Sequence, residues 1–297
     1  MLTRVKSRLL RDPVFGYILV APLMLWLTVT LFYPLVRAVI VSFLGIDYFG
    51  QSGSFVGFDN YAALVRTEDF HMPFLRSLVW TTANVAVQFV LAFGSALVLD
   101  LDFFGKKFLR NWIITPWVIP VIVIAVIWRW MLDPTFGVVN YLLQNSGLLA
   151  EPIAFLGSVN IAMITAIFIN SWRWFPFYAI ILLASLQTVP RDLYEAAWVD
   201  GARRIQRFIY ITVPTIAPVM LVVVLISSLW AVNVFDMLWL LTEGGPGSVT
   251  TTLPLWIYEK AFSEFRLAQA SAMAVLMFLI LLVYGSLYLR RLSPDEK

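Results

Sequence analysis

Long apolar runs alternate with short polar segments along the whole of this chain, and they set its architecture. Each run spans about 20 residues or more, the length that a helix needs to cross the hydrocarbon core of a bilayer. The pattern predicts an all-α integral membrane protein with six transmembrane helices, at about residues 14–41, 77–99, 112–131, 160–186, 215–241 and 267–289. They form one transmembrane domain at 14–291, between a short segment at 1–13 and a tail at 292–297.

The composition supports a membrane protein and removes several classes of function. Of the 297 residues, 61% are hydrophobic and only 13% are charged, against about 25% charged residues in soluble domains. Cysteine is absent, which excludes disulfides and thiolate chemistry. The formal net charge is only +3, and the basic residues gather near the ends of the predicted helices. We therefore expect membrane lipids, and no nucleic acid, among the partners.

The distribution of basic residues predicts how the chain lies in the membrane. With the N-terminus inside, the inner segments hold 14 Lys and Arg residues, the outer segments hold 6, and Arg173 remains within the fourth helix. The positive-inside rule therefore places both termini and the segment at 187–214 in the cytoplasm. The first apolar run follows a basic start but is too long for a cleavable signal peptide, so we expect it to stay as the first transmembrane helix.

The polar segment at 187–214 connects the fourth and fifth helices and carries a helical pattern of its own. Pro190 suits the first turn of a helix, and Asp192 follows where the helix dipole favours an acid. Gly201 predicts a turn, after which residues 202–211 form a second short helix. Apolar residues recur at helical spacing through both pieces: Leu193, Ala197, Trp198, Ala202, Ile205, Phe208 and Ile209. A helix on the aqueous side with such an apolar face needs a protein partner.

The same segment contains Glu195-Ala196-Ala197, then Gly201, Ile211 and Val213-Pro214 at fixed intervals. This spacing resembles the cytoplasmic loop of the permease subunits of bacterial binding-protein-dependent ABC importers, with Val213 in place of leucine as the only departure. The resemblance implies a type I ABC importer permease fold, in which the loop is a coupling helix that docks on an ATPase subunit. The residues that it implies for coupling are Glu195, Ala196, Ala197, Asp200, Gly201, Ile211 and Pro214.

Three further segments are similar to the sugar-transporting, maltose-type branch of that family. They are FVGFDNYAAL at 55–64, WRWMLDPTFGVVN at 128–140 and the Gly-Gly-Pro turn within 242–252. The resemblance implies that this turn faces an external solute-binding protein. It also implies a second homologous permease subunit and two ATPase subunits as partners, in a complex of the bacterial inner membrane.

The sequence contains no apparent catalytic or cofactor site. A phosphate-binding G-x-x-x-x-G-K-[ST] motif is absent, so ATP and Mg²⁺ would be bound by the partner ATPase subunits. His71 is the only histidine, and there is no cysteine or second histidine with which it could share a metal. We therefore expect a non-catalytic transport subunit without a cofactor or metal of its own.

Two charged residues within the predicted helices point to a substrate path. Arg173 lies in the fourth helix, where a charge costs about 2.5–3.5 kcal/mol, and Asp236 lies in the fifth. They either form a structural pair or leave Arg173 to bind substrate. The resemblance to maltose-type permeases implies sugar contacts from both helices, although the aromatic residues there could simply pack against neighbouring helices. The predicted substrate-binding residues are Asn170, Arg173, Trp174, Phe177, Ser227, Trp230, Asn233 and Asp236.

The sequence leaves alternatives open at two levels. An ion-gradient-driven secondary carrier is the alternative from another class, but it would need embedded acids or histidines as a relay, and only Asp236 qualifies. Within the importers, a permease for a glycerol-phosphate type of substrate is an alternative to one for a di- or oligosaccharide. Arg173 leaves open whether the transported compound is neutral or anionic.

Overall fold

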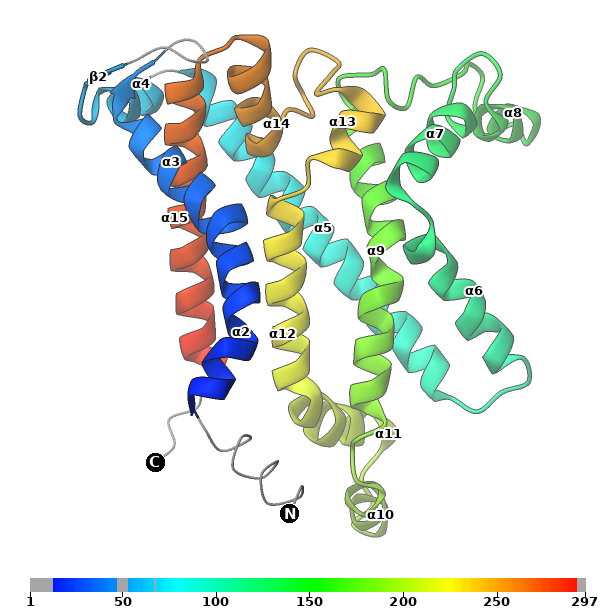
Figure 1. Cartoon of the computed structure of the whole chain (residues 1–297). Coiled ribbons are helices and arrows are strands. Elements are labelled where there is room, and N and C mark those ends of the chain that lie inside the picture. The colour runs from blue at the N-terminus through cyan, green and yellow to red at the C-terminus, as the bar shows by residue number, and fades with distance from the viewer. Residues whose placement is uncertain (1–12, 47–52, 67, 293–297) are drawn as a thin grey trace, which may run out of the picture. The chain divides into compact units, whose positions relative to one another are not determined.

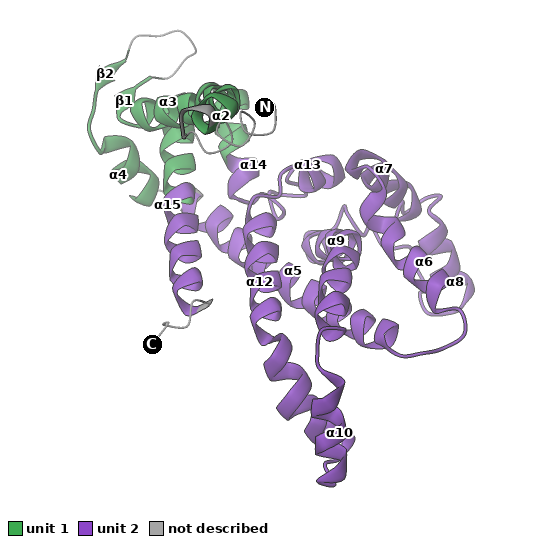
Figure 2. Ribbon diagram, turned by 60° about the horizontal axis from the view of Figure 1, so that its bottom comes forward, with its two compact units in different colours: residues 1–66, 257–277 green, residues 67–256, 278–297 purple. Residues whose placement is uncertain are grey.

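The computed structural model describes residues 13–46, 53–66 and 68–292, which are almost entirely helical (Figure 1). Unit 1 comprises Met1–Arg66 and Ile257–Met277, and unit 2 comprises Thr67–Trp256 and Phe278–Lys297 (Figure 2). The helices are α2 (Pro13–Leu27), α3 (Tyr33–Ser42), α4 (Asp59–Arg66), α5 (Glu68–Asp100), α6 (Lys106–Val118), α7 (Val121–Met131), α8 (Val138–Asn145), α9 (Ala162–Leu186), α10 (Arg191–Val199), α11 (Arg204–Arg207), α12 (Val213–Val232), α13 (Asp236–Thr242), α14 (Leu253–Tyr258) and α15 (Leu267–Leu292). Three π-helical turns, η1 (Thr28–Phe32), η2 (Phe208–Thr212) and η3 (Glu259–Ser263), join consecutive helices, and β1 (Leu44–Gly45) pairs antiparallel with β2 (Ser54–Phe55).

Among the described residues, five helices are long and apolar enough to cross a membrane, and a sixth is present if one bent pair is counted as a single span. The five are Gly16–Ser42, Phe70–Asp100, Ala162–Leu186, Arg204–Val232 and Leu267–Arg291. This confirms the predicted all-α membrane architecture. Two of the six predicted helices nevertheless differ from the prediction in their course.

The third predicted helix, at 112–131, is broken. α6 and α7 meet at an angle of 97°, and Ile119 and Pro120 between them are extended, with ψ of 132° and 139°. Proline supplies no backbone N–H and pushes the residue before it out of the helical region. The third predicted helix, at 112–131, is therefore present only as two helices that are bent apart at Ile119 and Pro120.

The fifth predicted helix, at 215–241, is divided as well. α12 ends at Val232, and α13 starts a separate short helix at Asp236. The Asp236 carboxylate accepts a hydrogen bond from the backbone N–H of Met237 at 2.8 Å, which satisfies one donor at the start of α13. Asp236 therefore lies at the start of a short separate helix and not deep within a membrane-spanning one. The sequence predicts Asp236 within the fifth membrane helix, where it could act as an ion relay, and the structure corrects this placement.

The core of unit 2 is the packing of α5 against α9, with α12 beside both (Figure 1). Ala92 and Ala96 on α5 and Ala179 on α9 are fully buried. Such small residues let transmembrane helices approach closely, which compensates for the weak hydrophobic driving force within lipid. Larger buried residues, among them Leu99, Leu182 and Ile216, complete this hydrophobic cluster.

Unit 1 is built on the long helix that runs from α2 through η1 into α3. The most apolar window of this helix has no residue buried within the chain. At its end, the side-chain amide of Asn60 donates to the carbonyls of Ser42 and Leu44 at 2.9 and 3.0 Å. The Tyr61 hydroxyl lies 2.6 Å from the Ser42 hydroxyl. These bonds fix α4 against the start of the β-hairpin.

Unit 1 also holds a compact charged group around η3. The ammonium of Lys260, which is 8% exposed, donates to both carboxylate oxygens of Glu264 at 2.7 and 2.8 Å. Neighbouring Glu259 is half-buried. Burial raises the pKa of Glu259 above its ordinary value, the charge of Glu264 raises it further, and Lys260 opposes both effects.

Candidate functional site

The predicted coupling segment lies at one end of unit 2, where α10 projects beyond α9 and α12 (Figure 1). Pro190 precedes α10 in an extended conformation. The helix ends at Val199, and Gly201 then adopts a φ of +78°, which non-glycine residues rarely adopt. The N–H of Ala202 closes the turn by donating to the carbonyl of Ala197 at 2.8 Å. The predicted helix followed by a glycine turn is thus confirmed.

The second short helix differs from the prediction because it does not end near Ile211. α11, η2 and α12 run on as one helix, Arg204–Val232. The N–H of Arg203 donates to the side-chain oxygen of Gln206 at 2.7 Å and so caps the start of α11. The second part of the predicted coupling segment is therefore continuous with the fifth transmembrane helix.

A side-chain contact attaches α10 to that helix. The hydroxyl of Tyr194 on α10 lies 2.7 Å from the hydroxyl of Thr212 on η2. Tyr194 also packs against the hydrophobic cluster of α5, α9 and α12. A force applied to α10 would accordingly be passed to the transmembrane helices through packed side chains.

The outer face of α10 and of the following turn is exposed and partly apolar. Trp198 and Val199 are 71% and 80% exposed, and Ile205 on α11 is 72% exposed. No described part of the chain covers these side chains. Among the predicted coupling residues, Glu195, Ala196, Asp200, Gly201 and Pro214 are exposed, while Ala197 and Ile211 are half-buried.

The predicted substrate-contacting aromatic residues do come together. Trp174 and Phe177 of α9 lie 4.8 and 5.5 Å, between ring centroids, from Trp230 of α12. Trp117 of α6 stacks on Phe177 at 5.3 Å. Trp230 remains 42% exposed and Trp117 remains 41% exposed. We call these four residues the aromatic surface.

Arg173 lies near the middle of α9, next to the aromatic surface. Its guanidinium carbon is 5.0 Å from the ring centroid of Trp174, a cation–π contact. The Nε atom is buried and has no hydrogen-bond partner within the described part of the chain. Asp236 attracts Arg173 electrostatically, yet no ion pair joins the two among the described side chains. The structure therefore does not show the structural ion pair between Arg173 and Asp236 that was one of the two predicted alternatives.

Asn233 and Asp236 are exposed. The side-chain amide of Asn233 donates to the carbonyl of Leu229 at 2.7 Å, so its oxygen stays available. Asn170 and Ser227 are placed differently, because they are only 1% and 3% exposed. These two predicted substrate ligands lie inside the helix bundle.

Their environment is a buried polar network that links α5, α9 and α12. The side-chain oxygen of Asn84 accepts from the amide of Asn170 at 2.7 Å, from the hydroxyl of Ser171 at 3.3 Å and from the amide of Gln88 at 3.2 Å. The oxygen of Gln88 in turn accepts from the hydroxyl of Ser227 at 2.8 Å. Interhelical hydrogen bonds of this kind fix the rotation of transmembrane helices about their axes.

Sequence reasoning missed the α5 members of this network. Asn84 and Gln88 are 0% and 2% exposed, and Trp80 on the same face donates from its indole N–H to the carbonyl of Ala231 at 3.0 Å. The sequence does contain a signal for these residues, namely two amide side chains four residues apart in an otherwise apolar run. Such residues rarely face lipid.

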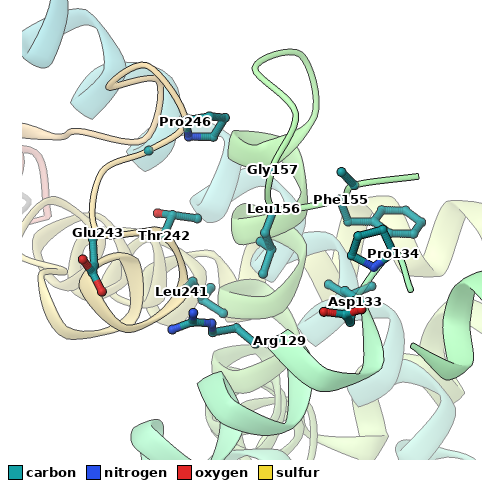
Figure 3. A pocket seen from close by; sticks show the side chains of 13 residues that line it. Arg129, Asp133, Pro134, Phe155, Leu156, Gly157, Leu241, Thr242, Glu243 and Pro246 are labelled. Atoms are coloured by element: carbon teal, nitrogen blue, oxygen red, sulfur yellow. The ribbon is translucent and has the colours of Figure 1, made fainter. Parts of the chain in front are cut away.

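The opposite end of unit 2 contains a cavity of about 480 Å³ (Figure 3). It is lined by the end of α7, the 154–157 loop and the turn after α13. Its charged residues are Arg129, Asp133 and Glu243. Asp133 accepts the backbone N–H groups of Thr135 and Phe136 at 2.8 and 3.2 Å, which orders the turn after α7.

The segments next to this cavity are held in place by two features that do not line it themselves. Buried Asn140 of α8 donates to the carbonyl of Ile153 at 3.0 Å and accepts from its N–H at 2.8 Å. A Cβ on Gly137 would lie 2.3 Å from the carbonyl oxygen of Asp133, so only glycine fits this turn. The predicted Gly-Gly-Pro turn is also ordered, because the Thr250 hydroxyl donates to the carbonyl of Gly245 at 2.9 Å.

The comparison with protein families decides the identity of this bundle. Residues 88–296 match the family described as binding-protein-dependent transport system inner membrane component. The chain belongs to this family. It is therefore a permease subunit of a transport system that depends on a binding protein, and an independent ion-driven carrier is no longer an alternative.

Individual relatives of this permease match over almost its whole length. The sulfoquinovosyl glycerol transport system permease protein SmoG of Agrobacterium fabrum is 34% identical, over 97% of this chain and 93% of its own. The trehalose/maltose transport system permease protein MalF of Thermococcus litoralis is 31% identical, over 94% of both chains.

A solved structure shares the fold of the permease. It is a bacterial ABC transporter involved in the import of the acidic polysaccharide alginate, and one of its chains superposes with a TM-score of 0.84 at 24% sequence identity. The match covers 99% of this permease and 100% of that chain. The resemblance read from the Glu195 to Pro214 segment is thereby confirmed as an ABC importer permease fold.

Proposed function

We propose that this permease is one of two membrane subunits of an ATP-driven importer for carbohydrates or related polyols. SmoG and MalF, the relatives described above, are named for transport of sulfoquinovosyl glycerol and of trehalose and maltose. The observation that carries the coupling part of the proposal is the exposed α10, which ends in a glycine turn at Gly201 and is bonded through Tyr194 to Thr212 at the start of the fifth transmembrane helix.

The coupling helix in this proposal is α10, which docks in a cleft of an ATPase subunit. Trp198 and Val199 supply an apolar area that has no cover within the described chain, and Glu195 supplies a charge for a basic residue of the partner. ATP and Mg²⁺ are held by two ATPase subunits, while the permease itself carries out no hydrolysis and needs no cofactor. This arrangement requires α10 and both chain termini to lie in the cytoplasm, as the distribution of basic residues predicts.

Substrate in this proposal passes along the aromatic surface between the two permease subunits. Aromatic faces stack on the C–H faces of sugar rings, and polar groups at the edge fix the orientation of the hydroxyls. Trp230, Asn233 and Asp236 are exposed on this side and make first contact. Asn170 and Ser227 act indirectly in this proposal, because their hydrogen bonds in the buried polar network hold α9 and α12 in register.

The external end of the path receives substrate from a solute-binding protein. The cavity beside Arg129 and Glu243 and the ordered turn at 242–252 provide a preformed contact surface there. ATP binding would draw the two coupling helices together, and the rigid link through α11 would transmit this motion to α12. The path would then open alternately to the two sides of the membrane.

The test is saccharide-stimulated ATPase activity of the complex, co-purified with its partners and reconstituted in lipid nanodiscs. We expect one member of a panel of saccharides and glycerol phosphates, presented by the binding protein, to stimulate hydrolysis severalfold. Gly201→Asp should abolish the stimulation by straining the turn, while the complex still folds, because a Cβ at Gly201 meets no atom within 4 Å and Asp is among the non-glycine residues that adopt positive φ most often. Equal stimulation in the variant would contradict the proposed coupling, and a complex that never contains an ATPase would contradict the whole proposal.

A further inference from the structure

We propose that the transported saccharide is anionic and that Arg173 binds its negative group. This inference rests on the proposed function, because it assumes that the aromatic surface lies along the substrate path. It adds the charge of the substrate, and it names Arg173 as the residue that selects for that charge.

The first argument is the position of Arg173. It lies near the middle of α9, a helix with the length and hydropathy of a membrane span. A charged side chain at that depth is costly unless it meets a counter-charge or water. The guanidinium has no hydrogen bond and no ion pair among the described residues, and its buried Nε is unpartnered. If position 173 had only a structural role, an apolar residue there would make the protein more stable than an unpaired arginine does.

The second argument concerns Asp236, which attracts Arg173 electrostatically. Asp236 is exposed, and its carboxylate is bonded to the backbone N–H of Met237 at 2.8 Å. It thus has a local partner at the start of α13, and it does not close an ion pair with the arginine. A substrate anion at hydrogen-bonding distance from the guanidinium would attract it more strongly than Asp236 does, because Coulomb attraction falls with distance and Asp236 makes no ion pair with it.

The third argument is the chemistry that surrounds the guanidinium. Trp174 holds it by a cation–π contact at 5.0 Å, so the guanidinium is oriented before substrate arrives. A planar guanidinium binds a carboxylate, sulfonate or phosphate with two parallel hydrogen bonds. The ring of Trp174 is also 4.8 Å from Trp230, and the two offer apolar faces for a sugar ring. An anionic group on a sugar ring satisfies the arginine and the aromatic surface together, whereas a neutral sugar leaves the charge uncompensated.

The test measures binding directly to the nanodisc complex without the binding protein, so that the selectivity of the binding protein does not enter. The probes are maltose, maltose with its terminal hydroxymethyl group oxidised to a carboxylate, and maltose with a sulfonate at the same position. We expect at least one acidic probe to bind about tenfold or more tightly than maltose, which corresponds to about 1.4 kcal/mol. Arg173→Gln should remove this preference, and Arg173→Lys should keep part of it.

Two further variants keep the test decisive. Asp236→Asn leaves Arg173 in place and should tighten binding of the acidic probe severalfold without tightening binding of maltose. Arg110→Gln removes an exposed positive charge near the start of α6 and should leave the preference unchanged. Maltose that binds as tightly as both acidic probes, with ATPase stimulation by neutral sugars, would overturn this inference and leave the proposed function standing. The absence of saccharide binding and stimulation of any kind would overturn both.

Discussion

Asn84→Ala should lower the free energy of unfolding more than other single truncations in the helix core, because the side-chain oxygen of Asn84 accepts three hydrogen bonds. Its side-chain oxygen accepts from Asn170 at 2.7 Å and, less strongly, from Ser171 and Gln88 at 3.3 and 3.2 Å. The side-chain oxygen of Asn170 has no hydrogen-bond partner among the residues that the structure describes. Alanine at position 84 would therefore leave the whole amide of Asn170 unsatisfied in the bundle interior.

The expected loss follows from the strength of such bonds. Hydrogen bonds between membrane helices contribute about 0.6 kcal/mol on average and about 1.7 kcal/mol at most, and an unsatisfied buried group costs about 1–3 kcal/mol. One short bond and two long ones, with one amide orphaned, give a loss of about 2 kcal/mol. Ser171→Ala removes a single long bond and should cost about 0.5 kcal/mol.

Unfolding of the purified protein by SDS in mixed micelles gives the free energies needed for this comparison. Thr81→Val is the matched control, because the Thr81 hydroxyl on the same helix is buried and makes no hydrogen bond. Replacing it with an isosteric apolar residue should leave stability unchanged or raise it. If Asn84→Ala and Thr81→Val gave the same free energy of unfolding, the network would contribute nothing and the reasoning would be refuted.

Three further changes test other parts of the structure. Gly137→Ala should destabilise the protein by about 1–3 kcal/mol, seen as a lower melting temperature, because the new Cβ meets backbone atoms. Tyr194→Phe should cost about 1 kcal/mol of local stability and speed amide hydrogen exchange in α10, because the bond to Thr212 is lost. Glu259→Gln should raise stability at neutral pH, because the raised pKa of Glu259 means that its charged form is disfavoured in the fold.

Each of these changes has a control. Gly157→Ala should be tolerated, since its Cβ would lie at an ordinary 3.4 Å from the Cβ of Ala154; similar melting temperatures for the two glycine variants would contradict the close approach. Unchanged exchange of α10 in Tyr194→Phe would show that the anchoring bond is not formed. The contribution of Glu259 to stability is fully present below the ordinary carboxyl pKa and is lost as pH rises through the raised pKa, and Glu259→Gln should remove this part of the pH dependence.

The apolar membrane helices, the short helix and glycine turn at 190–201 and the family could be predicted from the sequence, because each depends on local patterns. The run of about 20 apolar residues reports a membrane helix whatever its neighbours are, and the turn at Gly201 needs only a residue that tolerates positive φ. The break at Pro120 also had a local signal, but the membrane setting argued for tolerance of proline.

The interior of the substrate region could not be predicted in the same way. Asn170 and Trp230 both fit a sugar site by residue type, yet the first faces the bundle interior and the second is exposed. Which side of α9 faces inward depends on Asn84, a residue far away in the sequence. The division between α12 and α13 similarly moved Asp236 from the depth of a helix to the start of a new one.

The most direct test of the coupling role of α10 uses the absence of cysteine from the natural sequence. A single cysteine at Trp198, on the exposed face of α10, is compared with one at Phe104, on the turn between α5 and α6, where the side chain is fully exposed. With the ATPase subunits bound, the cysteine at position 198 should be protected from a thiol reagent and the one at position 104 should react freely. Equal and rapid labelling of both, in a complex that retains its ATPase subunits, would contradict the docking of α10 and with it the proposed route from ATP hydrolysis to transport.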